Sequence, residues 1–195
     1  MSSIVIVNYS AGNIFSVQTA CSRLGYETVV SSSPAVIAGA DKVIIPGVGN
    51  SGIAMDSLRE AGLTCLVPRL TQPVLGICLG MQLFYSFLEE SDEPGLKIVP
   101  RSVDRFPVGA LPVPHMGWNR VTSLKGPLFK GIDEGEWFYF VHSFRALADE
   151  NSVALSNYGE LFTAAVSRDN FFGCQFHPEK SGEAGSRVLK NFLEL

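Results

Sequence analysis

With 195 residues, of which 46% are hydrophobic, the chain can bury one full core but is too short for two ordinary domains, so we expect a single domain over residues 1–195. Its formal net charge of −4 and the lack of a Lys/Arg block argue against a nucleic-acid-binding surface, and no apolar run is long enough to span a membrane. The four cysteines, at positions 21, 65, 78 and 174, form no C-x-x-C pair, which argues against a disulfide framework or a structural zinc site and favours the reducing cytoplasm.

Short apolar runs alternate with helical patterns over the first 90 residues. Strands are predicted at 4–8, 27–31, 42–45 and 74–77, and helices at about 14–24, from 34, at about 51–61 and from 79. The helix from 79 is expected to continue to residue 88, because Leu79, Leu83 and Phe87 recur at four-residue spacing. This β-α alternation predicts a parallel, doubly wound sheet with helices on both faces and with ligands at the carboxyl ends of its strands.

Segments after residue 97 follow a different pattern, since they alternate or run apolar with turn residues between them. These segments are 98–106, 118–122, 137–144, 153–157, 161–166 and 171–176. We interpret them as antiparallel strands added around the parallel core, and we expect a final helix from about residue 183. The predicted fold class is therefore α/β, with a mostly parallel sheet and additional antiparallel strands.

Cys78 lies where the strand at 74–77 gives way to a helix, in the stretch Gly76-Ile-Cys-Leu-Gly80. This is the pattern of a nucleophile elbow with cysteine in place of serine. The glycines would let two backbones approach closely around a strained turn, and the helix N-terminus would favour the thiolate. Taken alone, the pattern fits equally well a small buried side chain beside two loop glycines. The other three cysteines lie in strand or helix patterns and are expected to be buried.

A cysteine nucleophile needs a base, and the chain has three histidines. His177 follows the apolar run 171–176 and precedes Pro178, which ends the strand, and Glu179, which could orient the imidazole. His142 lies within a strand pattern, where a hydrogen-bonded core histidine is the commoner outcome, and His115 lies in a stretch too rich in large residues for a plain turn. We favour His177 as the base. A metal site is the weaker alternative, because no two histidines share a helix at ligand spacing.

Acyl transfer also needs hydrogen-bond donors for an oxyanion. The backbone N–H of Leu79, at the start of the predicted helix, is one natural donor. The loop Pro46-Gly-Val-Gly49, at the end of the strand at 42–45, could offer another, because glycine permits backbone orientations that other residues resist. An ordinary glycine-rich turn is the alternative interpretation of this loop.

Three motifs together resemble the class I, triad-type glutamine amidotransferases: Pro46-Gly-Val-Gly49, Gly76-Ile-Cys-Leu-Gly-Met-Gln82 and Phe176-His-Pro-Glu179. Within that class, further motifs resemble the glutaminase subunits of imidazole glycerol phosphate synthases, from histidine biosynthesis. These motifs are His115-Met-Gly-Trp-Asn119, Tyr139-Phe-Val-His-Ser143, Asn157-Tyr-Gly159, Phe162-Thr-Ala-Ala165 and His177-Pro-Glu-Lys-Ser181. The resemblance covers essentially the whole chain, with no departure at a matched catalytic position.

The resemblance implies a complete reaction. Cys78 would attack the side-chain amide of glutamine, His177 would move the proton and Glu179 would orient His177. A γ-glutamyl thioester would form, ammonia would leave, and water would release glutamate. The implied oxyanion residues are Gly47, Val48 and Leu79, and the implied glutamine-binding residues are Gln82, Glu90, Ser143 and Phe144.

The resemblance also implies a partner, a separate (β/α)₈-barrel cyclase subunit that would receive the ammonia. The residues implied to face it are Asn13, His115, Met116, Trp118, Asn119, Tyr139 and Lys180. No metal or organic cofactor is implied. Two other interpretations are a subunit of anthranilate or aminodeoxychorismate synthase, which the 115–119 motif and Lys180 fit poorly, and a catalytically silent regulatory module. Silent modules commonly lack the nucleophile or the base, and this chain has both.

Overall fold

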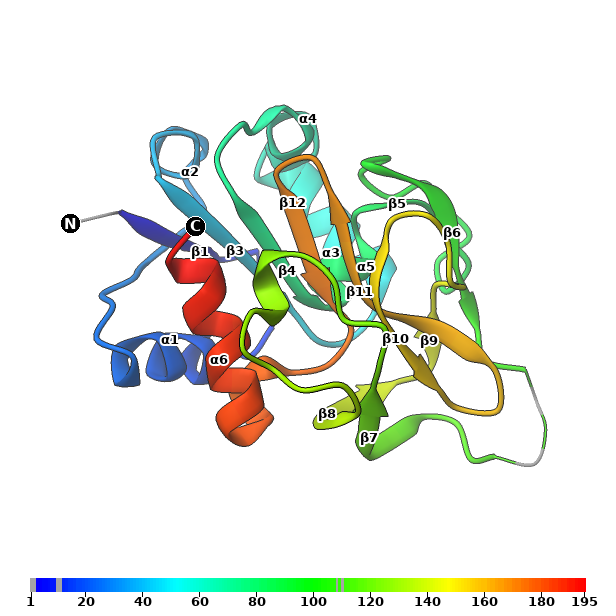
Figure 1. Cartoon of the computed structure of the whole chain (residues 1–195). Coiled ribbons are helices and arrows are strands. Elements are labelled where there is room, and N and C mark those ends of the chain that lie inside the picture. Colours follow the sequence, from blue (N-terminus) through cyan, green and yellow to red (C-terminus); the bar gives the residue numbers. More distant parts are fainter. Residues whose placement is uncertain (1–2, 10–11, 108, 110) are drawn as a thin grey trace.

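The computed structural model describes residues 3–9, 12–107, 109 and 111–195, so Ser10 and Ala11, in the loop after the first strand, lie outside the described residues. Within these ranges a seven-stranded sheet forms the centre of the molecule, in the order β10-β11-β12-β4-β3-β1-β2 (Figure 1). Its strands are β1 (Ile4–Val7), β2 (Val29–Ser31), β3 (Lys42–Gly47), β4 (Val74–Cys78), β10 (Ser152–Asn157), β11 (Leu161–Arg168) and β12 (Phe171–Cys174). Neighbouring strands from β2 to β12 are parallel, and β11 and β10 are antiparallel additions, so the predicted α/β class is confirmed.

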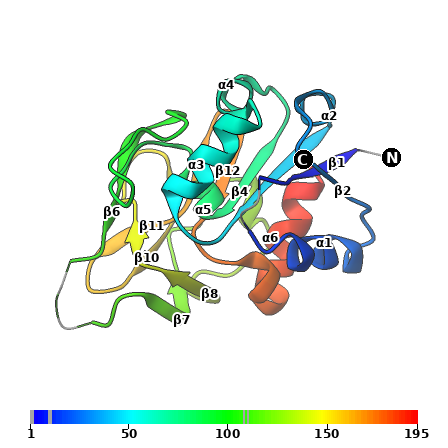
Figure 2. The same ribbon diagram turned by 180° about the vertical axis from the view of Figure 1, so that it is seen from behind.

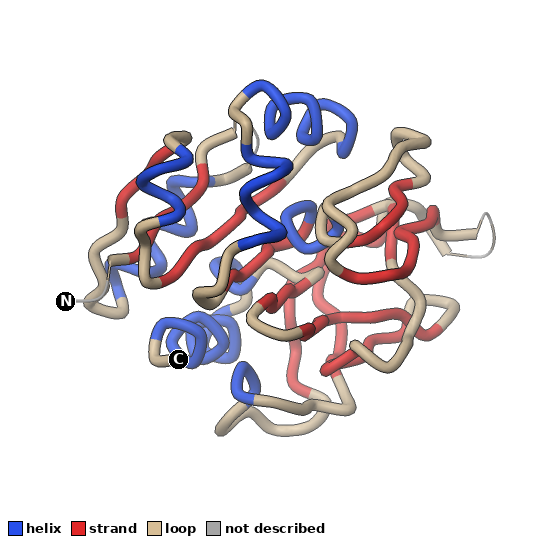
Figure 3. Tube along the Cα trace, turned by 90° about the horizontal axis from the view of Figure 1, so that it is seen from above, coloured by secondary structure: helices blue, strands red, loops and turns tan. Residues whose placement is uncertain are grey.

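Helices cover both faces of this sheet. Successive side chains of a strand point to opposite faces, so a strand of apolar residues needs a covering layer on each face. In β1, Val5 and Val7 belong to one apolar cluster, whereas Ile4 and Ile6 belong to the other. The first cluster is covered by α2 (Pro34–Ala38), α3 (Ser51–Glu60) and α4 (Leu63–Leu66), and the second by α1 (Ile14–Arg23) and α6 (Gly182–Leu193). Figures 1 and 3 show the two helical layers on opposite sides of the strands. None of the helices in the described ranges is both long and apolar enough to cross a membrane.

Strand β12 was expected to be an antiparallel addition, but it lies inside the sheet, parallel to β4, with Cys174 opposite Ile77. It is antiparallel only to β11, from which a turn at Asp169 and Asn170 leads back into the sheet. The four residues of β12 are apolar and buried, as is typical of an internal parallel strand. As a result, the chain leaves β12 at the same edge of the sheet at which it leaves β4.

The predicted helix from residue 79 to 88 is wrong beyond its first turn. Helix α5 is Leu79–Gln82, and the next residues form strand β5 (Tyr85–Leu88), which pairs in parallel with β6 (Val99–Arg105). The carbonyls of Leu83 and Phe84, which a longer helix would use internally, accept hydrogen bonds from the N–H groups of Leu96 and Ile98, both at 2.8 Å. Pairing with this later segment therefore prevails over the local helical pattern.

A lobe of smaller sheets lies beside the central sheet (Figure 2). Strand β6 pairs with the short β9 (Phe144–Arg145), and β7 (His115–Val121) forms an antiparallel pair with β8 (Glu136–His142). Short 3₁₀ turns complete the connections: η1 (Val67–Arg69), η2 (Pro127–Phe129) and η3 (Pro178–Lys180). The predicted strand at 137–144 is thus divided at Ser143, between β8 and β9, where the chain passes the carboxyl edge of the central sheet.

Candidate active site

The backbone at Cys78 has the strained geometry expected of a nucleophile elbow. Its φ of 53° and ψ of −109° lie in a region that residues with a side chain rarely adopt. A Cβ atom at Gly80 would lie 1.9 Å from the carbonyl oxygen of Ile45, and one at Gly76 would lie 2.6 Å from the carbonyl oxygen of Gly80. Both glycines are therefore required for the close approach of β3, β4 and α5. Because α5 has a single turn, the helix dipole expected at Cys78 is limited to that turn's N–H groups.

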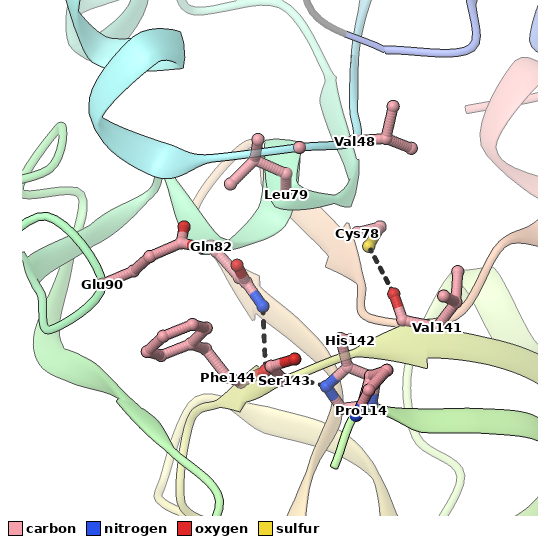
Figure 4. A pocket seen from close by; sticks show the side chains of 11 residues that line it. Val48, Cys78, Leu79, Gln82, Glu90, Pro114, Val141, His142, Ser143 and Phe144 are labelled. Atoms are coloured by element: carbon pink, nitrogen blue, oxygen red, sulfur yellow. Dashed lines mark hydrogen bonds between the residues drawn. The ribbon is translucent and has the colours of Figure 1, made fainter.

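Cys78 lies in the wall of a cavity of about 290 Å³ (Figure 4). The cavity is lined by Val48, Gly49, Cys78, Leu79, Gln82, Glu90, Pro114, Val141, His142, Ser143 and Phe144. This wall contains all four predicted glutamine-binding residues and two of the three predicted oxyanion residues. The third, Gly47, lies behind the wall, where a Cβ atom would be 2.6 Å from the backbone nitrogen of Gly80.

His177 and Glu179 follow β12 and lie buried beside the cysteine. Nδ1 of His177 is 2.9 Å from Oε1 of Glu179, the residue that the sequence analysis predicted to orient the ring. Nε2 of His177 is buried and has no hydrogen-bond partner among the described residues. Burial alone would lower the pKa of His177, but the interactions with Cys78 and Glu179 outweigh burial and raise this pKa to about 10. The site therefore favours the charged form of the His177 ring.

Gln175 is a site residue that the sequence analysis missed. Its side chain is fully buried, and its Nε2 lies 3.7 Å from Sγ of Cys78. Its Oε1 accepts a hydrogen bond of 3.0 Å from Nε2 of Gln82. The signal that could have revealed it is a single amide side chain within the apolar run 171–176, two residues before His177. A buried amide in such a run needs partners, and here the partners are the cysteine and Gln82.

The residues predicted to bind glutamine are held by hydrogen bonds from several elements. Nε2 of Gln82 donates to the carbonyl oxygen of Phe144 at 2.9 Å, as the dashed line in Figure 4 marks. Oε2 of Glu90 accepts a hydrogen bond of 2.7 Å from the backbone N–H of Ser51, the first residue of α3. Among the described residues that line the cavity, Glu90 is the acidic one.

Tyr9 holds the start of the predicted oxyanion loop, Pro46-Gly-Val-Gly49. The Tyr9 hydroxyl donates a hydrogen bond of 2.5 Å to the carbonyl oxygen of Pro46. Burial, together with the neighbouring Cys78, raises the pKa of Tyr9 far above its usual value, so this hydroxyl remains a donor. Beyond Gly47 the loop is open, and 41% of Val48 is exposed.

His142 and His115 form a buried pair, with His115 Nδ1 3.0 Å from His142 Nε2. The expectation of a hydrogen-bonded core histidine at 142 is confirmed. His115 was expected to face a partner, but only 3% of it is exposed, because its ring stacks on Phe140 and Tyr158 in the core of the lobe. Burial lowers the pKa of His115 to about 4 and that of His142 to about 3.

This pair predicts a loss of stability in acid. Each ring has a folded-state pKa below its unfolded value near 6.5, so the chain takes up protons when it unfolds below that pH. The stability that depends on neutral rings is present above pH 6.5 and is lost as the pH falls towards 4 and 3. His142→Asn should make the fall in unfolding free energy between pH 6 and 4 shallower by about 1.4 kcal/mol per pH unit, one proton's share. Urea unfolding at several pH values measures this slope, and equal slopes in both proteins would contradict the assignment.

The remaining residues predicted to face a partner lie at or near the surface. Met116, Trp118 and Lys180 are exposed, whereas Asn13, Asn119 and Tyr139 are half-buried. The rings of Trp118 and Tyr139 lie opposite each other in the β7–β8 pair, with centroids 6.1 Å apart. The side chain of Asn13 also caps α1, because its oxygen accepts a hydrogen bond from the N–H of Ser16.

The other cysteines differ from their prediction at one position. Cys21 and Cys174 are buried as expected, but Cys65 is exposed on α4. The apolar residues around Cys65 suggested burial, but α4 is one turn long and directs this side chain outward. In the part of the chain that the structure describes, no group of three or more His, Cys, Asp or Glu side chains is arranged to hold a metal ion.

Comparisons with known proteins show which family the sequence belongs to. The sequence matches the family "Glutamine amidotransferase class-I" over residues 5–195. It is 50% identical over 194 residues to a protein of Pectobacterium atrosepticum, covering 98% of this chain and 99% of that protein. It is 49% identical over 195 residues to a protein of Haemophilus influenzae, covering 100% and 98%. Both relatives are named "Imidazole glycerol phosphate synthase subunit HisH".

The fold is also found in solved structures of low sequence identity. The structure of PurLQS from Thermotoga maritima superposes with a TM-score of 0.74 at 17% identity, covering 100% of this chain and 99% of that chain. This similarity shows the fold, whereas the family match and the curated relatives identify the group. The chain belongs to the class-I glutamine amidotransferase family, in the group of the HisH subunits of imidazole glycerol phosphate synthase.

Proposed function

We propose that this chain, as a single amidotransferase domain, is the glutaminase subunit of an imidazole glycerol phosphate synthase in histidine biosynthesis. It hydrolyses L-glutamine to glutamate and passes the ammonia to a (β/α)₈-barrel cyclase subunit, with which it forms a heterodimer. The observation that carries this proposal is the arrival of Cys78 and the His177–Glu179 pair at one sheet edge, from the adjacent parallel strands β4 and β12.

The chemistry proceeds through a thioester. His177 takes the thiol proton of Cys78 at Nε2, and the thiolate attacks the side-chain carbonyl carbon of glutamine. The tetrahedral intermediate collapses, its C–N bond breaks, and His177 returns the proton to the leaving nitrogen as ammonia departs. Water then attacks the thioester with His177 as base, and glutamate and the thiol are restored. Glu179 holds the ring in place and stabilises its charged form.

The cavity supplies groups for both ends of glutamine. Glu90 is placed to accept the α-ammonium group, because it is the acidic side chain of the described cavity wall. Gln82 and the backbone of Ser143 and Phe144 line the same cavity (Figure 4). The cavity volume of about 290 Å³ suits a single amino acid of this size.

The backbone N–H of Val48 is the proposed second oxyanion donor, beside that of Leu79. Val48→Pro removes this N–H, and loss of one such donor should lower glutamate release by about a hundredfold with little change in KM. Val48→Ala keeps the N–H group and is the matched control. Steady-state hydrolysis by the complex measures both, and full activity of Val48→Pro would contradict the assignment.

We further propose that the peptide before Val48 points away from the oxyanion in the isolated subunit and turns inward when the partner and its nucleotide ligand bind. Gly47→Ala cannot test this, because its Cβ atom would lie 2.6 Å from the nitrogen of Gly80 and 2.8 Å from the Tyr9 hydroxyl. Tyr9→Phe is a cleaner probe, since it releases only the hydrogen bond to Pro46. It should change the ratio of activated to basal hydrolysis more than it changes the KM for glutamine.

The partner face is proposed to lie on the β7–β8 pair and the adjoining turns, where Met116 and Trp118 are exposed. Tyr139, Asn119, Asn13 and Lys180 complete it, whereas His115 supports it from within. The experiment that tests the proposal is co-purification with the barrel cyclase, followed by glutamate release from the subunit alone, with the cyclase, and with the cyclase and its nucleotide. Failure to hydrolyse glutamine in all three mixtures would refute the function.

A further inference from the structure

A continuous series of hydrogen bonds joins the half-buried Asn119 of β7 to the wall of the glutamine cavity. Nδ2 of Asn119 lies 3.3 Å from Nε2 of His115, and Nδ1 of His115 lies 3.0 Å from Nε2 of His142. Nδ1 of His142 then lies 2.7 Å from the carbonyl oxygen of Phe144. No step of the glutaminase mechanism above uses either histidine.

The direction of these hydrogen bonds follows from the chemistry of their ends. The Phe144 carbonyl can only accept, so His142 carries its proton on Nδ1. In a neutral ring the Nε2 of His142 must then accept, so His115 donates from Nδ1. Nε2 of His115 is left as an acceptor for the amide of Asn119. Every ring nitrogen of the two histidines then has a hydrogen-bond partner with both rings neutral. Burial lowers the pKa of each ring, which also favours the neutral form.

Packing holds both rings in this orientation. His115 stacks on Tyr158 with ring centroids 4.0 Å apart and on Phe140 with centroids 5.0 Å apart. His142 contacts Phe106 and Phe162, with centroids 5.2 and 5.3 Å apart. Rotation of either ring would therefore break aromatic contacts as well as hydrogen bonds.

The carbonyl at the end of this series is shared with the substrate site. The same Phe144 oxygen accepts the hydrogen bond from Nε2 of Gln82. That amide also bonds to Gln175, whose Nε2 lies 3.7 Å from Sγ of Cys78. The position of the Phe144 peptide thus determines where Gln82 and the backbone at 143–144 lie in the cavity.

We propose that His142, oriented by His115, is a positioning residue for glutamine: it fixes the Phe144 carbonyl and so preorganises the side of the cavity formed by Gln82, Ser143 and Phe144. The inference rests on the proposed function, since glutamine is the ligand concerned. Preorganisation of a binding wall acts mainly on substrate affinity, whereas loss of the base acts on the chemical step. The two kinds of residue are therefore separable by kinetics.

The test compares three proteins as complexes with the cyclase. His142→Leu removes the donor to Phe144, and the KM for glutamine should rise at least about tenfold while kcat changes less than about threefold. His142→Asn places an amide nitrogen near the former Nδ1 and should restore the KM to within about threefold of the wild type. His115→Phe keeps the stacking but removes the partner that orients His142, and should raise the KM about threefold. It also serves as the test if His142→Leu does not fold.

A second measurement separates positioning from a general loss of structure. In a Cys65→Ser background, a diazoketone analogue of glutamine should label Cys78 about tenfold more slowly in His142→Leu, whereas iodoacetamide should label it at the wild-type rate. An unchanged KM, no rescue by His142→Asn, or an equal fall with both reagents would overturn the inference. A wild-type complex that turns over no glutamine would overturn both the inference and the proposed function.

Discussion

Replacing Cys78 by serine should abolish glutamine-dependent synthesis by the complex, with a loss of at least about ten-thousandfold. The thioester requires the sulfur, and a serine hydroxyl at the same strained turn is a far weaker nucleophile towards an amide. Added ammonium should still support synthesis, because the cyclase receives ammonia from solution instead of from this subunit. Product formation from glutamine and from ammonium, measured side by side, checks both halves of this expectation.

The control for this substitution is selective labelling. A glutamine-like electrophile should modify Cys78 and leave Cys21 and Cys174 unmodified, because both are fully buried. Cys65 is exposed, so the labelling belongs in a Cys65→Ser parent. Equal labelling of the remaining three thiols, or glutamine-dependent synthesis by Cys78→Ser, would contradict the assignment of the nucleophile.

Replacing His177 by asparagine should lower glutamine hydrolysis by roughly a hundredfold or more, as the loss of a general base does. The variant loses the nitrogen that takes the Cys78 proton and later protonates the leaving ammonia. Glu179→Gln should cost less, because an amide at this position still accepts the hydrogen bond from Nδ1 but no longer stabilises the charged ring. The kcat for glutamate release by the complex is the quantity to measure.

The matched controls are His142→Asn and His115→Asn, at the two other histidines of the chain. Neither ring has a place in the proposed proton transfer, and both bond to each other within the lobe. If either substitution reduces kcat as much as His177→Asn does, then His177 is not the base.

Local sequence was sufficient to predict the parallel strands and helices up to Cys78, because apolar runs and helical periodicity there agree with the tertiary structure. It failed for Tyr85–Leu88, where a later segment supplies the hydrogen-bond partners, and for β12, whose place beside β4 depends on a hairpin with β11. The residues of the cavity wall were named by the family resemblance, whereas the two-residue spacing of His177 and Glu179 was enough to expect their side chains to pair. Gln175 was missed because its partners, Cys78 and Gln82, lie more than 90 residues away.

The central position of β12 has a consequence for synthesis on the ribosome. Until residue 174 has emerged, the edge of β4 that β12 will occupy has no strand beside it, and this edge carries apolar residues such as Leu75 and Ile77. At about 5 to 20 residues per second, the interval between completion of β4 and of β12 lasts roughly 5 to 20 s. During that time the nascent chain presents an open sheet edge that can pair with other chains, so any chaperone that protects this edge has a defined window in which to act. Glutamine turnover therefore requires the segment from Phe171 to the C-terminus, about the last eighth of the polypeptide, to have closed this gap, which makes it a direct report of completed folding.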